Sequence, residues 1–150
     1  MNPWDARQLA LELLKAHDLS DWSFTFNHRK RSLGLCRYRE KQIELSLHYI
    51  KRNEHDAIKD TILHEIAHAL AGHEAGHGPK WIKKCQEIGA NPQRLDTTAT
   101  MPKGNYSATC PGCQKIHHRY RRPLKGRKYF CKPCGPSVGQ LVFGRPSSAT

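Results

Sequence analysis

The sequence lacks the features that would place it in a membrane or outside a cell. Its 150 residues contain no apolar run near the ~18 residues that a membrane span needs, and its mean hydropathy is −0.74. The N-terminal segment lacks the basic-then-apolar order of a secretory signal. We therefore expect no membrane partner and a location in the cytoplasm, nucleoid or nucleus, not a secreted protein.

Acidic residues are absent from the last third of the chain. Residues 101–150 contain ten Lys and Arg and no Asp or Glu, whereas residues 1–100 contain 15 and 13 of the two classes. This asymmetry predicts a nearly neutral domain over 1–98 and a basic domain over 99–143, followed by a disordered tail at 144–150. A dense positive surface attracts nucleic acid through phosphate contacts and counterion release, but it can also serve solubility or bind an acidic protein.

The chain contains six cysteines, and four of them form two close pairs, Cys110, Cys113, Cys131 and Cys134. Their spacing, C-x₂-C-x₁₇-C-x₂-C, is typical of a zinc ribbon that holds a structural Zn²⁺. Two disulfides are the alternative. The missing secretory signal favours reduced thiolates on zinc. Cys36 and Cys85 have apolar neighbours and are expected to be small buried residues.

Histidine and glutamate form the zinc-binding pattern H-E-x-x-H at His64, Glu65 and His68. Because positions i and i+4 lie on one face of a helix, both imidazoles can bind one Zn²⁺, with the glutamate beside them. An apolar stripe over 57–71 predicts the required helix, with Asp56 as its N-cap. The alternative is an amphipathic helix that carries two surface histidines.

The third zinc ligand must come from the segment after this helix, where His73, Glu74 and His77 follow closely. The segment is rich in glycine, and Pro79 is well suited to begin another helix, so His77 lies at a fixed point after a turn. Spacing favours His77 over His73, with Glu74 third. A structural site would be closed by a fourth protein ligand, whereas a catalytic site leaves that position to water.

These motifs together resemble the SprT-like family of zinc metallopeptidases, which includes the Spartan protease domain. The similarity lies in residues 63–70, in the run 76–79 (Gly-His-Gly-Pro), in Trp81, and in the upstream stretches 33–36 and 43–46. A four-cysteine zinc ribbon is a common partner in that family. The resemblance covers roughly residues 22–143.

The resemblance implies a zinc-dependent endopeptidase whose substrates are proteins bound or crosslinked to DNA. His64, His68 and His77 would hold the catalytic Zn²⁺, and Glu65 would be the general base for a water activated by it. The four cysteines would hold a second, structural Zn²⁺. On this basis His73 is not expected to be a ligand.

The expected fold class is α+β, with a zincin-like metallopeptidase domain followed by a small β zinc ribbon. We expect the helices of the first domain to pack on a small antiparallel sheet. The expected elements are a helix over 3–17, strands over 22–27, 33–38 and 41–46, and helices over 57–71 and 79–88. An edge strand beside a zinc cleft can bind an extended peptide by adding it to the sheet. A monomer is expected.

Basic and aromatic residues are interleaved between the cysteine pairs. The predicted nucleic-acid contacts are Arg119, Tyr120, Arg121, Arg122, Lys125, Arg127 and Lys128. Basic side chains can contact phosphates while aromatic rings stack on unpaired bases. This combination of residues favours single-stranded DNA as the partner. The alternative is that the rings form the small core of the ribbon. A second basic segment, residues 28–31, is either a solvated turn or a phosphate contact.

Two other functions are compatible with the sequence. One is a non-enzymatic nucleic-acid-binding factor with two structural zinc sites, in which His73 or Glu74 closes the first site. The other is a zinc hydrolase that acts on a non-peptide amide. Metal coordination separates the first from a peptidase, and an assay of protein cleavage separates the second.

Overall fold

The computed structural model describes residues 1–93 and 99–145, which group into two compact units. The first unit is Met1–Pro102, and the second begins at Lys103. Part of the predicted tail, residues 146–150, lies outside the described residues, while Gly144 forms a β-bridge with Ser107. Within the described ranges, no helix has the length and apolar composition that crossing a bilayer requires.

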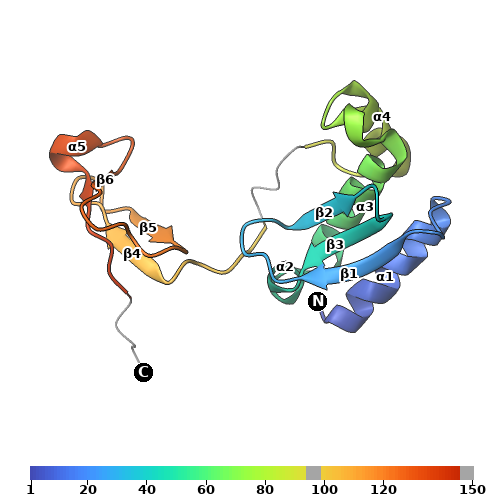
Figure 1. Ribbon diagram of the computed structural model, residues 1–150, viewed down its shortest axis with the longest axis horizontal. Coiled ribbons are helices and arrows are strands. Elements are labelled where there is room, and N and C mark those ends of the chain that lie inside the picture. Colours follow the sequence, from blue (N-terminus) through green and yellow to red (C-terminus); the bar gives the residue numbers. More distant parts are fainter. Residues whose placement is uncertain (94–98, 146–150) are drawn as a thin grey trace. The chain divides into compact units, whose positions relative to one another are not determined.

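The first unit is built on three strands, β1 (Ser23–Asn27), β2 (Gly34–Arg37) and β3 (Gln42–Ser46), in the order β1-β3-β2 (Figure 1). β3 is antiparallel to β2 but parallel to β1. The sheet is therefore mixed, and the expectation of an antiparallel sheet is wrong. Successive strands reverse direction, so the first and third point the same way. They become neighbours because β3, the most buried strand, takes the centre.

The helices of this unit are α1 (Pro3–Ala16), α2 (Leu47–Arg52), α3 (His55–Ala71) and α4 (Pro79–Ile88), with a short 3₁₀ turn, η1 (His73–Ala75). α1 begins as its sequence predicts, since Asn2 Oδ1 accepts a hydrogen bond from Asp5 N at 3.1 Å.

The start of α3 differs from the prediction, because its N-cap is Glu54 and Asp56 lies inside the first turn. Ile58 N donates to Glu54 O at 3.1 Å, which closes a helical turn before the predicted start. An acidic side chain in the first turn still interacts favourably with the helix dipole. The helix therefore starts earlier than predicted, and the H-E-x-x-H motif still lies on it.

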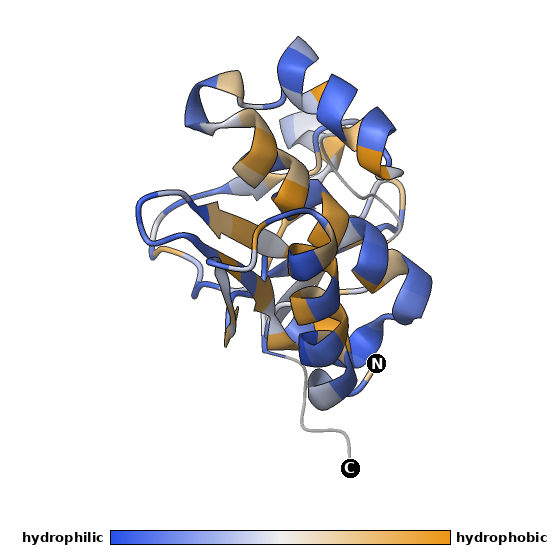
Figure 2. Ribbon diagram, turned by 90° about the vertical axis from the view of Figure 1, so that its right-hand side faces the viewer, coloured by the Kyte–Doolittle hydropathy of each residue, from blue (hydrophilic) through white to orange (hydrophobic). Residues whose placement is uncertain are grey.

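The core of the first unit lies between the helices and the sheet, and Figure 2 shows the hydrophobic residues of both gathered there. Its largest fully buried side chains are Trp81, Tyr49, Leu14, Ile43, Leu45, Ile50, Ile58, Ile62 and Ile66. Ile58, Ile62 and Ile66 recur every fourth residue on α3 and anchor that helix in the core. The packing of this face therefore stabilises the helix that carries the motif.

The chain after α4 is hydrogen-bonded to the rest of the first unit at Asn91 and at Thr100. Asn91 N donates to Asp60 Oδ1 at 2.8 Å, and Thr100 N donates to Asn53 Oδ1 at 3.0 Å. Residues 94–98 lie outside the described part of the chain. The described residues 99–102 therefore belong to the first compact unit.

The second unit consists of two short hairpins. β4 (Tyr106–Thr109) pairs with β5 (Ile116–Arg119), and β6 (Tyr129–Phe130) pairs with β7 (Gln140–Leu141), both antiparallel, with the short α5 (Gly135–Val138) between β6 and β7. The buried residues at its centre are Ala108, Cys110, Cys131 and Leu141. So small an apolar core rarely supports a fold by itself, and small domains of this kind commonly depend on a metal.

Candidate metal centres and the cleft

Three histidines of the first unit converge on one point. The Nε2 atoms of His64 and His68 are 3.2 Å apart, those of His68 and His77 are 3.2 Å apart, and those of His77 and His64 are 3.3 Å apart. His64 and His68 are one helical turn apart on α3, and His77 precedes α4, which begins at Pro79. The structure thus brings together the three residues that the sequence and the family resemblance indicate.

The geometry of these nitrogens fits a tetrahedral metal. Ligand atoms about 2.0–2.1 Å from a tetrahedral zinc lie roughly 3.3 Å from one another. Burial and the neighbouring imidazoles lower the pKa of His64 to about 4, and burial and His77 lower that of His68 to about 4. Both rings are therefore neutral near pH 7, which is the form that binds a metal.

Trp81 on α4 forms a wall behind all three imidazoles. Its ring centroid lies 4.6 Å from that of His64, 5.2 Å from that of His68 and 4.7 Å from that of His77. Trp81 is 1% exposed, and its Nε1 donates to the backbone oxygen of His64 at 3.3 Å. The indole therefore ties α4 to α3 and restricts the orientations that the histidines can adopt. The sequence places Trp81 in the family motif but does not indicate this contact with each histidine.

Glu65 is buried beside the three histidines. It is 7% exposed, and burial raises the pKa of its carboxyl to about 8. Gly34 of β2 approaches this side chain closely, because a Cβ at Gly34 would lie 3.1 Å from Glu65 Oε1. The sequence alone did not indicate that a glycine on the edge strand leaves room for this carboxylate.

A cleft of about 620 Å³ opens over the histidines and Glu65. One wall is formed by residues 31–35, which include the start of β2, and another by the segment after α4, including Asn91 and Met101. Asp60, whose carboxylate holds Asn91 N, fixes part of the second wall to α3. The histidines therefore lie in an accessible cleft and not in a closed interior.

His73 and Glu74 do not join the histidine group. Within the described residues, the ligand atoms that cluster at this site belong to His64, His68 and His77, and both His73 and Glu74 are exposed. The ring of His73 instead meets the ring of Tyr38 edge-on, with centroids 5.2 Å apart. This contact holds the turn before His77 against Tyr38, which follows β2.

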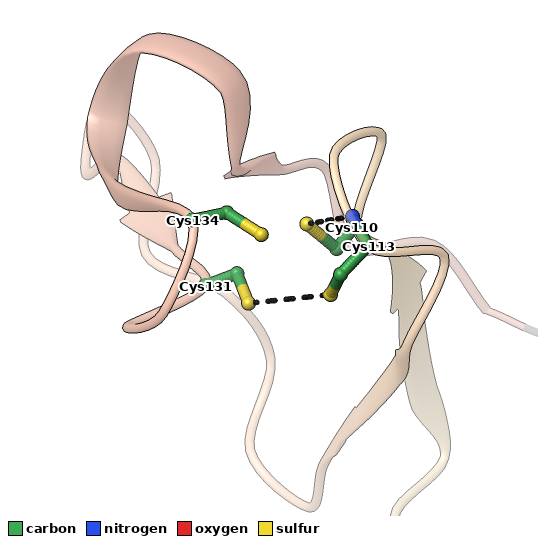
Figure 3. Close-up of side chains that lie close together, drawn as sticks. All are labelled: Cys110, Cys113, Cys131 and Cys134. Carbon is green, nitrogen blue, oxygen red and sulfur yellow. Dashed lines mark hydrogen bonds between the residues drawn. The ribbon is translucent and has the colours of Figure 1, made fainter.

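The four cysteines of the second unit form a separate group, and Figure 3 shows their sulfurs turned toward one another. Cys113 Sγ lies 3.8 Å from Cys131 Sγ, close to the roughly 3.8 Å expected for two thiolates on a tetrahedral zinc. All four are free thiols, so the disulfide alternative does not hold here. A backbone hydrogen bond from Cys113 lowers the pKa of Cys110 to about 7. The group is compatible with zinc.

The remaining cysteines are single. Cys85 is fully buried, as expected, whereas Cys36 is only partly buried. Burial is the main cause that raises the pKa of Cys36 to about 12 and that of Cys85 to about 11. Both stay neutral thiols near pH 7, consistent with a packing role.

The predicted nucleic-acid contacts of the second unit divide into two sets. The exposed set is Arg121, Arg122, Lys125, Arg127 and Lys128. Arg119 and Tyr120 are partly buried, and the Arg119 guanidinium lies 4.4 Å from the ring centroid of Tyr129. Arg119 therefore contributes a cation–π contact inside the unit, and the exposed set offers the accessible charges.

Comparison with known proteins relates this chain to one family. The model of the SprT-like family matches residues 6–101. Protein SprT of Pseudomonas putida strain GB-1 is 26% identical over 129 residues, which cover 73% of this chain and 74% of the relative. Protein SprT of Proteus mirabilis strain HI4320 is 25% identical over 137 residues, which cover 83% and 80%. Protein SprT of Pseudomonas savastanoi pv. phaseolicola is 26% identical over 124 residues, which cover 73% and 74%.

Proposed function

The chain belongs to the SprT-like family, and on that premise we propose that it is a zinc endopeptidase acting on proteins bound or crosslinked to DNA. The observation that supports this proposal best is the triangle of Nε2 atoms, 3.2 to 3.3 Å on each side, in an open cleft beside a buried glutamate. Three imidazoles and an accessible fourth position are the arrangement of a catalytic zinc site.

Each residue of the site has a distinct role in this proposal. His64, His68 and His77 hold the ion, and Trp81 limits their movement. Zinc bound there supplies Lewis acidity and a water that ionises near neutral pH. Glu65 takes a proton from the attacking water and passes it to the leaving amine. Burial raises the pKa of the Glu65 carboxyl and so favours its protonated form. A metal cation bound nearby would lower that pKa again and favour the carboxylate, which accepts the proton.

The edge strand β2 supplies a surface for an extended substrate. β2 pairs with β3 on one side, and in the described part of the chain no strand pairs with its other side. Gly34 and Leu35 of β2 line the cleft. A peptide added to this edge would run past the histidines with its backbone hydrogen-bonded to the protein. Recognition of backbone and not of side chains suits a peptidase with many protein substrates.

The basic second unit supports the nucleic-acid part of the proposal. Its exposed arginines and lysines carry no acidic neighbours in the sequence from 101 to 150. Binding to DNA through these residues would raise the concentration of DNA-bound proteins near the cleft. Single-stranded DNA is the favoured partner, because the exposed ring of Phe130 has basic neighbours in the sequence and can stack on an unpaired base.

The non-enzymatic alternative requires a closed first site. Neither His73 nor Glu74 lies in the histidine group of the described residues, and each is exposed. A structural zinc site with three protein ligands would be unusual, because such sites normally have four. This observation favours the peptidase.

The decisive experiment compares Glu65→Gln with Glu74→Gln, which alters an exposed carboxylate near the same loop. Zinc content and cleavage of a DNA-binding protein are measured with and without single-stranded DNA. We expect both variants to keep zinc, and only Glu65→Gln to lose cleavage. Cleavage that persists in Glu65→Gln would refute the proposed role of Glu65. Cleavage confined to small amides, with none of proteins, would support the non-peptide hydrolase instead.

A further inference from the structure

A second group of basic residues lies on the first unit, away from the zinc ribbon motif in the sequence. We propose that this group, here named the loop–α2 cluster, binds the phosphate backbone of nucleic acid at the mouth of the cleft. Its members are His28, Arg29, Lys30 and Arg31 in the β1–β2 loop and His48, Lys51 and Arg52 in α2.

Hydrogen bonds hold the loop against the start of α2, where Ser46 is the N-cap. Ser46 Oγ donates to Arg29 O, and Ser46 N donates to Leu33 O at 2.9 Å. Both sides of the basic segment are therefore fixed to one residue. Figure 1 shows the loop between β1 and β2 at the same end of the sheet as α2. The two basic segments form one surface, although Arg29 and Lys51 are far apart in sequence.

The charges of the cluster have one sign. Neither the loop segment 28–31 nor α2 contains Asp or Glu. Arg52 Nη1 donates to His48 O at 3.0 Å, which holds the guanidinium along α2. The pKa of His48 is lowered by desolvation and then by Arg52, Lys30, His28 and Lys51, as expected where cations from both segments lie near one imidazole. A surface with several cations and no acid in its segments attracts a polyanion.

The cluster is continuous with the cleft wall. Arg31 belongs to the cluster and also lines the cleft, together with Ser32 and Leu33. A backbone bound to the cluster would therefore run beside the opening through which a protein substrate enters. The benefit to proteolysis rests on the proposed peptidase function, whereas phosphate binding by the cluster does not.

The kind of contact follows from the side chains. The long cations Arg29, Lys30, Arg31, Lys51 and Arg52 are exposed, and Tyr49, the aromatic residue of α2, is fully buried. Apart from the imidazoles of His28 and His48, the cluster therefore offers charge without an aromatic ring on which a base can stack. Contacts to phosphate do not depend on sequence, so we expect both single and double strands to bind.

The test uses the full chain with its zinc and a fluorescent oligonucleotide of mixed sequence, single- or double-stranded. The cluster variant is Arg29→Gln, Lys30→Gln, Lys51→Gln. The matched control, Lys15→Gln, Lys80→Gln, Lys83→Gln, removes three positive charges from α1 and α4 of the same unit. Both are also made with Arg121, Arg122, Lys125, Arg127 and Lys128 changed to Gln, so that binding by the second unit is weakened. Thermal unfolding and zinc content verify that each variant folds.

In the weakened background, we expect the cluster variant to lose at least tenfold in affinity for both oligonucleotides, and the control to lose less than threefold. The slope of log affinity against log salt should fall by about 2 for the single strand. Equal losses in the cluster and control variants would overturn the proposal. Oligonucleotide binding that is unchanged, with a loss of binding to poly-glutamate, would also overturn it in favour of an acidic polypeptide. Because binding is measured without cleavage, an inactive peptidase would leave this test intact.

Discussion

Gly34 on the edge strand lies directly against Glu65 on α3. A Cβ at Gly34 would approach Leu45 Cδ2 to 2.8 Å and Glu65 Cγ and Oε1 to 3.1 Å. We predict that Gly34→Ala displaces the carboxylate and lowers kcat/KM at least tenfold, about 1.4 kcal/mol of transition-state stabilisation. Overpacking should also lower the free energy of unfolding by about 1–3 kcal/mol. Steady-state kinetics on a peptide substrate and chemical denaturation measure the two effects.

Gly144→Ala is the matched control, since no atom lies within 4 Å of a Cβ built at that glycine. It should leave kcat/KM and stability near the wild-type values. If Gly34→Ala behaved like this control, the close approach of β2 would have no bearing on the position of Glu65.

The two histidines of the loop after α3 should behave differently. His77 Nε2 lies 3.2 Å from His68 Nε2, whereas His73 lies outside the histidine group and its ring contacts Tyr38. We predict that His77→Ala loses the zinc of the first unit, while His73→Ala retains it with an affinity reduced less than tenfold. Metal analysis after dialysis, and competition with a chelator, distinguish the two. Equal zinc loss in both variants would mean that His73 is itself a ligand.

Trp81 should contribute to both stability and metal affinity. Trp81→Ala removes a fully buried indole and should cost about 3–5 kcal/mol of stability. Trp81→Phe keeps a ring behind the histidines but loses the N–H that donates to His64 O, which should cost about 1 kcal/mol. We therefore expect zinc affinity to fall strongly in the alanine variant and slightly in the phenylalanine variant. Chemical denaturation and chelator competition measure these losses, and equal zinc affinity in both would contradict the proposed wall.

Local spacing in the sequence was sufficient to predict the pairs His64–His68, Cys110–Cys113 and Cys131–Cys134, whereas spacing only favoured His77, which the family resemblance singled out. His64 and His68 are one helical turn apart, and each cysteine pair spans a single turn of chain, so their proximity follows from backbone geometry. His77 is also close in sequence, and the bend at the glycines before Pro79 returns it to the helix.

Contacts between residues far apart in sequence could not be predicted in the same way. The parallel pairing of β1 with β3 depends on which strand is buried at the centre, and alternating apolar residues do not specify neighbours. The approach of Gly34 to Glu65 depends on how the sheet packs on α3. The predicted N-cap, Asp56, lies two residues from the observed one, Glu54, because helix ends shift by one or two residues with local hydrogen bonding that the sequence pattern does not specify.

The zinc-free protein should lose stability as the pH rises from about 6.5 to 8. Burial raises the pKa of Glu65 from 4.5 to about 8, so over that interval the folded state binds more protons than the unfolded state. Stability therefore falls with rising pH, by up to about 1.4 kcal/mol per pH unit. Below 6.5 the lowered pKa values of His64 and His68 act in the opposite direction. The interval above 6.5 therefore isolates the glutamate.

Glu65→Gln provides the comparison, because an amide of similar size does not titrate. Zinc is removed with a chelator, and unfolding is followed by tryptophan fluorescence. All three tryptophans, Trp4, Trp22 and Trp81, belong to the first unit, so the loss of zinc from the cysteine group does not disturb the signal. As the pH rises from 6.5 to 8, the free energy of unfolding of the wild type should fall relative to that of Glu65→Gln. A constant difference from pH 6.5 to 8 would show that Glu65 is already ionised in the folded protein, and hence better solvated than its burial implies.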